Sequence, residues 1–397
     1  MKNMLLHKIK DTERNVMDYG YAKFQHRSEI RKFQDSRRKE IYEKVQLTDS
    51  QKNQIKELFE KNYGEGIPDT WHRHYTAFTG QFDVNYFPEL LYIPEFEHFM
   101  NYQTEYAHVF ENKNVLPLIA KAVGVRMPEQ LYQCVSGYGT NPENEHEPIE
   151  AAAERLRDAG DLFLKPSVGT SSGVGCRLVH AADGMDTLTG EVVADIFRGM
   201  GRDFVVQRRV RCHESLRRIY PEAVNTFRIM TYFWKGKVLH APVIMRIGQG
   251  GRHLDNAHAG GMFIALDEDG SLHTTAFTEF KEQYEEHPDT HIRFDECKVA
   301  LLPRVIETAE RMHRSIPQLG VVNWDFTLDE DGTPLLIEAN VLGGGIWVFE
   351  MAHGKSAFGS LTPEILRWLR QMKRMSYTER EAWFARKCQR MRSYGSK

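Results

Sequence analysis

The residues of this chain best suited to chemistry lie in one predicted hairpin near its carboxyl end. Asp331-Gly332 is a typical two-residue turn, and it separates two stretches of alternating apolar residues, VVNWDFTL and PLLIEAN. Centring the pairing on this turn places Asp325 opposite Glu338, with Asn340 on the same side. Two opposed carboxylates repel each other unless a positive group lies between them. Because carboxylate and carboxamide oxygens suit a hard cation, we predict that these three residues bind Mg²⁺. The alternative is a solvated hairpin face with another register.

A second stretch, FLKPSVGTSSGVGCRLV at residues 163–179, has the composition of a phosphate-binding loop between two strands. Glycines let backbone N–H groups approach an anion closely, and a lysine at the end of the first strand adds positive charge. The Walker A and dinucleotide-binding patterns are both absent from the loop. An ordinary mobile hairpin turn is therefore the alternative to a loop that holds a nucleoside triphosphate. The candidate residues are Lys165, Gly169, Thr170, Ser171, Ser172 and Gly173.

Two arginines occupy apolar surroundings on successive predicted strands between these stretches. Burying an unpaired guanidinium is costly, so Arg228 and Arg246 each need an anionic partner. One interpretation is a structural ion pair with a carboxylate. The other is functional, because a bidentate guanidinium suits phosphate and carboxylate groups and could hold a transferred phosphoryl group and a developing oxyanion.

Size and composition indicate an ordinary globular protein. The chain has 397 residues, of which 41% are hydrophobic and 27% charged, enough for one large core or a few smaller ones. It has no apolar run of membrane-spanning length and no secretory signal at residues 1–10, so we expect no integral membrane segment and a cytoplasmic location. The formal net charge of -3 gives no reason to expect nucleic-acid binding. Five scattered cysteines without a CxxC pair argue against a disulfide framework or a zinc site.

The elements that must position these groups are strands in the middle of the chain and helices at both ends. The first forty residues carry eleven Lys/Arg and six Asp/Glu, which predicts a charged helical arm. The aromatic, His-rich segment 71–100 is expected to be mostly core. The pattern predicts an α+β protein with two lobes. We expect strands at residues 161–165, 176–179, 204–208, 226–234, 237–245 and 262–266, and helices at residues 149–158, 298–316, 363–375 and 377–392.

The order of these motifs resembles the ATP-grasp superfamily, and it is most similar to the ATP-grasp proteins found with sugar-transfer and cell-surface polysaccharide genes. The resemblance rests on KPSVGTSSGVG, VVQRRV, WDFTL and IEAN, and it covers roughly residues 113–372. It implies a nucleotide clamped between two α+β lobes, with the glycine-rich loop as a flap. The implied domains are a helical and aromatic region at 1–112, a central lobe at 113–208, a carboxyl-terminal lobe with the metal site at 209–376, and a final helix at 377–397.

The resemblance also implies where the nucleotide binds. Lys113 and Lys165 match two lysines that contact ATP. The strand at residues 204–210 matches the hinge whose backbone reads adenine; it includes Val210, and Gln207 stands where many relatives have Glu. Glu214 falls where the ribose hydroxyls are held.

The resemblance assigns the remaining candidates to metal and acceptor binding. Asp325, Glu338 and Asn340 match the metal ligands, which agrees with the hairpin argument. The Asp255-Asn256 pair before Gly260-Gly261 matches elements that border the acceptor pocket. The expected catalytic residues are Arg228, Arg246 and Asn256.

With ATP and Mg²⁺ as cofactors, the resemblance implies an ADP-forming ligase. In that reaction a substrate carboxylate takes the γ-phosphoryl group, and an amine captures the acylphosphate. The partners expected are a small-molecule carboxylate and amine, and glycosyltransferase-pathway proteins in polysaccharide or natural-product synthesis. Two alternatives remain open: a kinase that phosphorylates a sugar or polyol hydroxyl, and a nucleotide-binding module without catalysis.

Overall fold

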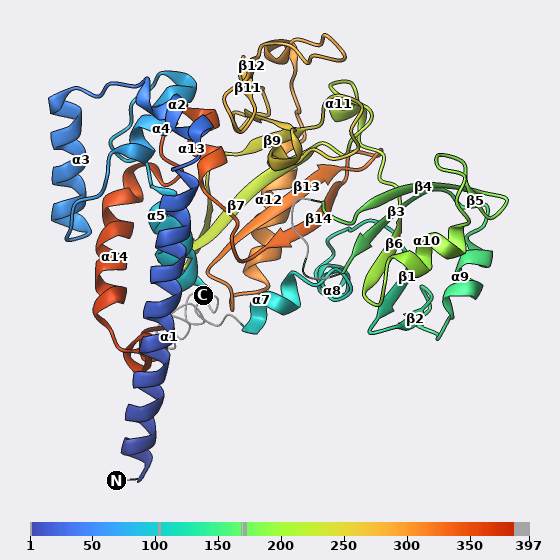
Figure 1. Ribbon diagram of the computed structural model, residues 1–397, viewed down its shortest axis with the longest axis horizontal. Helices are drawn as coiled ribbons and strands as arrows, with labels where there is room; N and C mark the ends of the chain where they lie inside the picture. Colours follow the sequence, from blue (N-terminus) through green and yellow to red (C-terminus); the bar gives the residue numbers. More distant parts are fainter. Residues whose placement is uncertain (1, 102–104, 168, 170–172, 385–397) are drawn as a thin grey trace, which may run out of the picture.

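The structure is a computed structural model that describes residues 2–101, 105–167, 169 and 173–384. A helical amino-terminal region, a large antiparallel sheet and a smaller antiparallel sheet follow one another across the molecule (Figure 1). This arrangement confirms the predicted α+β class with two lobes and a helical extension.

The amino-terminal region is built from helices and one π-helical turn. Its aromatic segment is mostly core, as predicted: Tyr75, Tyr86 and Phe87 are completely buried. Helix α3 begins with a capping box in which Thr48 and Gln51 satisfy each other's backbone N–H groups. The elements are α1 (Lys2–Lys32), α2 (Ser36–Glu43), α3 (Asp49–Asn62), α4 (Thr70–Thr79), α5 (Glu89–Leu91), the π-helical turn η1 (Tyr92–Glu97), α6 (His98–Met100), α7 (Glu105–Phe110) and α8 (Leu116–Ala122).

The smaller sheet has six strands in the order β2-β1-β6-β3-β4-β5. Two helices, α9 (Ile149–Arg155) and α10 (Val193–Gly199), pack on it around a core of their own. The sequence predicted the three central strands β6, β3 and β4, but it gave no signal for β1, whose QLYQCV mixes polar and apolar residues without strict alternation. The strands are β1 (Gln130–Val135), β2 (Tyr138–Thr140), β3 (Gly160–Pro166), β4 (Arg177–Ala182), β5 (Met185–Asp186) and β6 (Phe204–Arg208).

The larger sheet has eight strands, with β7 and β13 at its centre. The single strand predicted at residues 237–245 is two strands, because Pro242 lies between them and cannot donate to a ladder. Its strands are β7 (Thr226–Trp234), β8 (Lys237–His240), β9 (Ile244–Ile247), β10 (Met262–Ala265), β11 (Ala276–Phe277), β12 (Gln283–Tyr284), β13 (Val321–Leu328) and β14 (Pro334–Asn340). The helical turns between and after them are α11 (Glu214–Arg217), η2 (Ala257–Ala259), η3 (Phe294–Glu296) and η4 (Gly359–Leu361).

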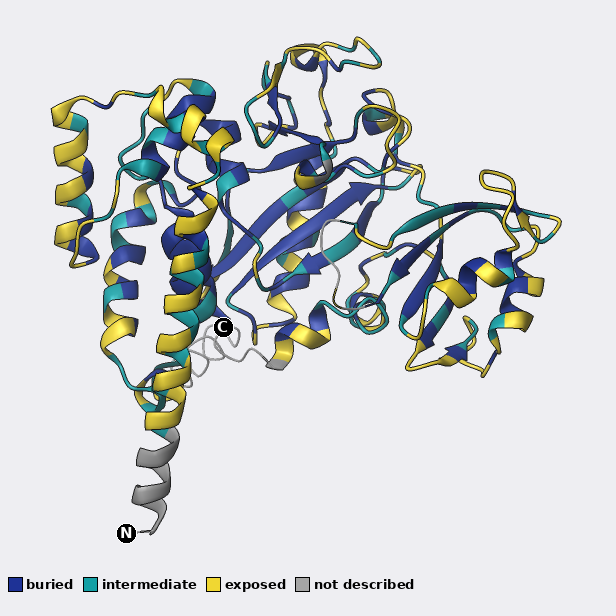
Figure 2. Ribbon diagram, viewed as in Figure 1, coloured by how far each residue is buried: buried dark blue, intermediate teal, exposed yellow. Residues whose placement is uncertain are grey.

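Both faces of the larger sheet are covered, so most of its strands are buried (Figure 2). Alternate residues of β7 show the two faces: Phe227 and Ile229 belong to the core on the side of α12 (Leu302–Arg314), whereas Met230 and Tyr232 belong to the core shared with the amino-terminal helices. Helices α13 (Trp347–His353) and α14 (Thr362–Arg374) lie on this second side. By the same alternation, the second face carries the polar candidates Arg228, Arg246, Asp325, Glu338 and Asn340.

The hairpin formed by β13 and β14 pairs Asp325 with Glu338, as predicted. The turn differs from the prediction, because Leu328 pairs with Pro334 around a loop in which Gly332 has a φ of +75°. A loop of this kind shifts the register by one residue relative to a two-residue turn. A bulge in β14 at Ile337 shifts it back, so the two deviations cancel at the acidic pair.

The predicted helices at 149–158, 298–316 and 363–375 correspond to α9, α12 and α14. The helix predicted at 377–392 lies partly outside the described residues. In the described part of the chain, no helix has the length and apolar character needed to cross a membrane.

Candidate active site

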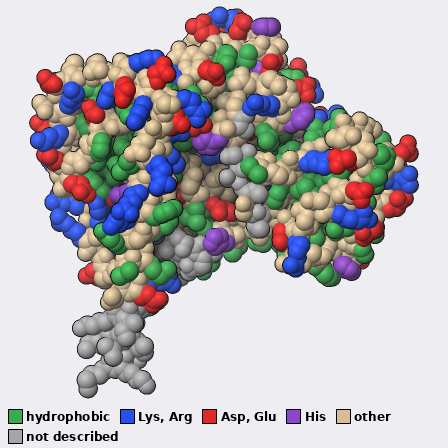
Figure 3. Space-filling view, viewed as in Figure 1, with side chains coloured by type: hydrophobic (Ala, Val, Ile, Leu, Met, Phe, Trp, Pro, Cys, Tyr) green, Lys and Arg blue, Asp and Glu red, His purple; other side chains and the backbone are tan. Residues whose placement is uncertain are grey.

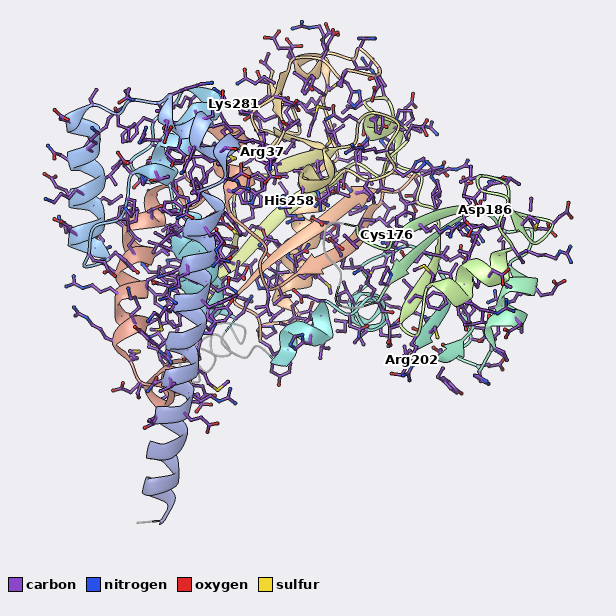
Figure 4. All side chains as sticks on the ribbon, viewed as in Figure 1. Arg37, Cys176, Asp186, Arg202, His258 and Lys281 are labelled. Atoms are coloured by element: carbon purple, nitrogen blue, oxygen red, sulfur yellow. The ribbon has the colours of Figure 1, made fainter. Side chains whose placement is uncertain are left out.

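A cleft of about 870 Å³ lies between the two sheets and reaches the amino-terminal helices. The surface is hollowed between the smaller lobe and the rest of the molecule (Figure 3), and Cys176 and His258, labelled in Figure 4, line the cleft from opposite sides. The structure brings most of the candidate residues to this one cleft. Those that line it are Lys113, Lys165, Gly169, Gly173, Gln207, Val210, Arg228, Arg246, Asn256, Glu338 and Asn340.

The remaining candidates lie elsewhere. Glu214 is exposed at the start of α11 and does not line the cleft, whereas Glu222 of the same stretch does. Asp325 is completely buried directly behind the cleft wall, beside Arg228. The flap residues Thr170, Ser171 and Ser172 lie outside the described residues.

Asp325 is held by two arginines from neighbouring strands. Arg228, its cross-strand partner on β7, donates from Nε to Oδ1 at 2.5 Å and from Nη2 to Oδ2 at 3.0 Å. Arg246 donates from Nη2 to the same Oδ2 at 2.9 Å. Burial alone would raise the pKa of Asp325, but the two guanidinium groups lower it. The charge that balances Asp325 in this structure is therefore supplied by the chain, in the ion pair that the sequence left as one of two interpretations.

Glu338 and Asn340 project from β14 toward the cleft. The carboxamide of Asn340 donates from Nδ2 to Glu338 Oε1 at 3.4 Å and to Asp325 Oδ2 at 3.3 Å. Burial and the neighbouring Asp325 carboxylate raise the pKa of Glu338. Lys113 and Arg246 lower it by a smaller amount, and Glu338 makes no direct ion pair of the kind that Asp325 makes among the described residues.

These three residues fit Mg²⁺ by donor chemistry, since all can supply oxygen ligands and the carboxylate of Glu338 has no cation in direct contact among the described residues. The two cleft-facing members are Glu338 and Asn340, and Asp325 lies behind them. No group of three or more His, Cys, Asp or Glu side chains that could hold a metal ion occurs in the part of the chain that the structure describes. A cation here would therefore depend on Asn340 and on ligands from the substrate.

Two lysines face the cleft from outside the larger sheet: Lys165 on β3 of the smaller sheet, and Lys113 in the segment between α7 and α8. Lys165, at the end of β3, is only 9% exposed, and burial lowers the pKa of its ammonium group. The backbone N–H of Lys113 donates to the carbonyl of Ser167, which fixes it beside the base of the flap. Among the described residues, no carboxylate lies within ion-pair distance of either ammonium group. Two cleft-lining ammonium groups without a carboxylate in direct contact favour an anionic ligand between them.

The flap residue Gly173 lies against the larger lobe. Gly173 has a φ of +74°, and a Cβ at this position would approach the side chain of Leu254 to 2.5 Å. Leu254 belongs to the segment between β9 and η2 that carries Asp255 and Asn256. Glycine is needed here both for the left-handed backbone and for the close approach.

Asp255 and Thr226 complete the polar network, and the sequence had not assigned Thr226 to it. Asp255 accepts from the backbone N–H of Thr226 at 3.0 Å, and the Thr226 hydroxyl accepts from Arg246 at 2.9 and 3.0 Å. Thr226 lies two residues before Arg228 and therefore on the same face of β7. This spacing could have identified Thr226 as part of the network. Asn256 accepts from the backbone N–H of His258 and so caps η2.

Comparisons with known proteins bear on this arrangement. A search of curated protein sequences finds no match to this chain. Among solved structures, the chain is similar to a D-Ala:D-Ser ligase from Enterococcus faecalis, at 12% identity and a TM-score of 0.39, over 67% of this chain and 62% of that one. It is also similar to a D-alanyl-alanine synthetase from Vibrio cholerae, at 16% identity and a TM-score of 0.40, over 66% and 65%. A third is an N5-carboxyaminoimidazole synthase from Aspergillus clavatus, at 13% identity and a TM-score of 0.36, over 61% and 47%.

This chain thus spans less than two thirds of the length of these solved proteins. The comparison with a protein-family model matches a larger part of this chain than the comparisons with solved structures do. The model of the sugar-transfer associated ATP-grasp family matches residues 93–364, which include the flap, both sheets and the acidic hairpin. The chain therefore belongs to the sugar-transfer associated ATP-grasp family.

Proposed function

We propose that this protein is an ATP-dependent ligase that joins a small carboxylic acid to an amine and releases ADP and phosphate. The observation that carries the proposal is the charge arrangement of the cleft: two lysines without a carboxylate partner face a wall of paired arginines and acids. A triphosphate fits between them, because its oxygens satisfy the ammonium groups.

Each wall has its own part in this reaction. Lys113 and Lys165 hold the phosphates, and Gln207 and Val210 on the hinge strand contact the base. Arg228 and Arg246 orient the γ-phosphoryl group and the substrate carboxylate, while Asp325 keeps both guanidinium groups in place. The arginines can do this only from fixed positions, since positioning and preorganised charge supply most of the rate in phosphoryl transfer.

Mg²⁺, when bound by Glu338 and Asn340 with Asp325 behind them, would neutralise charge on the β- and γ-phosphates. The substrate carboxylate attacks the γ-phosphorus, the bond to the β-phosphate oxygen breaks, and ADP leaves. The amine then attacks the acyl carbon, loses a proton and displaces phosphate. The amide is formed without a covalent bond to the protein.

The test is to incubate the protein with ATP, Mg²⁺ and a panel of small acids, with and without amines. We expect ADP and phosphate in equal amounts and a product whose mass equals acid plus amine minus water. In the presence of hydroxylamine, a hydroxamate of the acid should accumulate. A stable phosphate ester that resists hydroxylamine would instead indicate a kinase, and AMP with pyrophosphate would contradict both reactions.

A further inference from the structure

The loop that follows β14 is anchored by glutamates from far earlier in the chain. Residues 341–346 contain the run Gly343-Gly344-Gly345, whose backbone N–H groups would be free for an anion if nothing else bound them. Glu97 binds the N–H groups of the first two glycines instead, and two other glutamates bind N–H groups of the residues on either side of the run. Glu111 accepts from Val341 at 2.8 Å and Leu342 at 2.9 Å, Glu97 accepts from Gly343 at 2.6 Å and Gly344 at 2.9 Å, and Glu89 accepts from Ile346 at 2.9 Å.

Glu97 is the central member of this group. It is the last residue of the π-helical turn η1 and is only 1% exposed. Each of its oxygens accepts one backbone N–H, so the carboxylate fixes two successive peptide groups. π-Helical turns are rare and often occur at functional sites.

Gly344 connects the second of these peptide groups to the active site, because its carbonyl belongs to the next peptide group. Gly344 donates its N–H to Glu97, and its carbonyl oxygen accepts from Arg228 Nη1 at 3.3 Å. The other nitrogens of Arg228 bind Asp325. Every nitrogen of the guanidinium is thus fixed, and one of the three attachments depends on the position of Gly344.

Gly344 is also closely packed against the side chain of Asn323. A Cβ at this position would overlap the side-chain amide of Asn323, which in turn donates to the hydroxyl of Tyr92 at 3.2 Å. The backbone at Gly344 is therefore bound by Glu97 and packed against Asn323, where a larger residue would not fit.

We infer that Glu97 is a positioning residue: it holds the Gly344 carbonyl where Arg228 can bind it and so fixes the guanidinium for the transferred phosphoryl group. The inference rests on the proposed function, in which Arg228 contacts that group. It makes the helical segment before the sheets part of the active-site framework, although Glu97 touches no substrate.

The test is a double-mutant cycle on ADP release with Glu97→Gln, Arg228→Lys and the double variant. A glutamine side chain can accept a hydrogen bond from one of the two backbone N–H groups, but it places an NH₂ donor against the other. We expect kcat to fall about 10- to 100-fold in Glu97→Gln, because small displacements of positioning groups have effects of that size. Affinity for ATP, measured by calorimetry, should change less than about twofold, and hydrogen exchange in the 341–346 segment should quicken. The double variant should be no slower than Arg228→Lys alone.

Glu350→Gln is the matched control. Glu350 is completely buried and accepts backbone N–H groups from Phe87 and Ala357, but it does not line the cleft. It should lower the melting temperature as Glu97→Gln does and leave kcat within about twofold. Equal losses of kcat in the two variants, or multiplying losses in the cycle, would overturn the inference.

Two further results separate the possible failures. If Glu97→Gln does not fold, Gly344→Ala tests the same peptide from its other side and should lower kcat with ATP affinity kept. If the wild-type protein releases no ADP with any acceptor, the proposed function fails; unchanged exchange at residues 341–346 in Glu97→Gln would then show separately that the anchoring is wrong.

Discussion

The two walls of the cleft balance their charges in opposite ways. On the larger sheet, the chain itself pairs Asp325 with Arg228 and Arg246. On the second wall, Lys165 of the smaller sheet and Lys113 of the segment between α7 and α8 face the cleft with no carboxylate within ion-pair distance among the described residues. The ion pairs of the first wall are complete before any ligand binds, whereas the lysines of the second wall gain a close anionic partner only when a ligand arrives. We conclude that substitutions of the ion-paired residues in the first wall should affect folding and turnover together, whereas those in the second should mainly affect binding.

The largest effect should come from Asp325→Ala, which breaks the first wall. The change removes the carboxylate partner of Arg228 and leaves Arg246 with Asp255 alone, and removing one partner of a buried ion pair typically costs about 3–5 kcal/mol. We expect urea denaturation to show a loss of that size and ADP release to fall below detection.

Glu338→Gln is the variant to compare with Asp325→Ala. Because the pKa of Glu338 is already raised, its neutral isostere should keep the stability within about 1 kcal/mol while turnover is lost. Equal stability losses in the two variants would contradict the described pairing.

The second wall is tested by Lys165→Met. This side chain is similar in length but uncharged, and it removes a buried ammonium that has no partner, so the protein should be as stable as the wild type or slightly more stable. A charge-assisted contact to phosphate is worth about 1.5–3 kcal/mol, so affinity for ATP should fall about 10- to 100-fold. Calorimetric titration with ATP measures this. Lys235→Met, which removes an exposed lysine paired with Glu364, is the control and should leave the affinity unchanged.

The sequence predicted features of the walls that depend on neighbouring residues, and it did not predict those that depend on contacts between distant segments. The Asp325 and Glu338 pair could be predicted because one local hairpin sets its register. The choice of arginines as partners of Asp325 could not, since it depends on β7 and β9 lying in order beside β13. Lys165 could be predicted from its place before the glycine-rich loop, whereas Lys113 was found only through the resemblance.

Other parts of the fold and of the site could not be predicted from the sequence. Glu97 and its companions bind backbone N–H groups more than two hundred residues away, and a backbone N–H leaves no trace in the sequence. Strand β1 lacks strict alternation, and it forms because β6 offers it a partner. The place of Glu214 outside the cleft follows from the short helix α11, which the strand pattern did not predict.

Buried glutamates lie behind the first wall, so the comparison can also be tested by measuring stability as a function of pH. Burial raises the pKa of Glu97 to about 8 and that of Glu89 to about 7, from an ordinary value of 4.5. Between the ordinary and the raised values the folded state binds more protons than the unfolded state, so stability is lost as pH rises. From pH 7 to pH 9 we expect Glu97 to account for about 1 kcal/mol, or a fall in melting temperature of about 2 °C. Glu97→Gln should have a flatter profile over this range, and Lys235→Met, which removes an exposed lysine, should keep the wild-type slope.

The smallest effect should come from Gln207→Glu, which changes the second wall next to the expected base position. Gln207 is 3% exposed and lines the cleft on β6. Adenine presents an amino group at its six position and guanine an oxygen, so a carboxylate keeps an acceptor for adenine but loses the donor that a carboxamide offers to guanine. We therefore expect ATP affinity to change less than about threefold and GTP affinity to fall about tenfold, as one lost hydrogen bond implies. Competition titrations of the two nucleotides measure the ratio. A ratio equal to that of the wild type would show that Gln207 does not contact the base edge and that only the lysines give the smaller lobe its affinity for nucleotide.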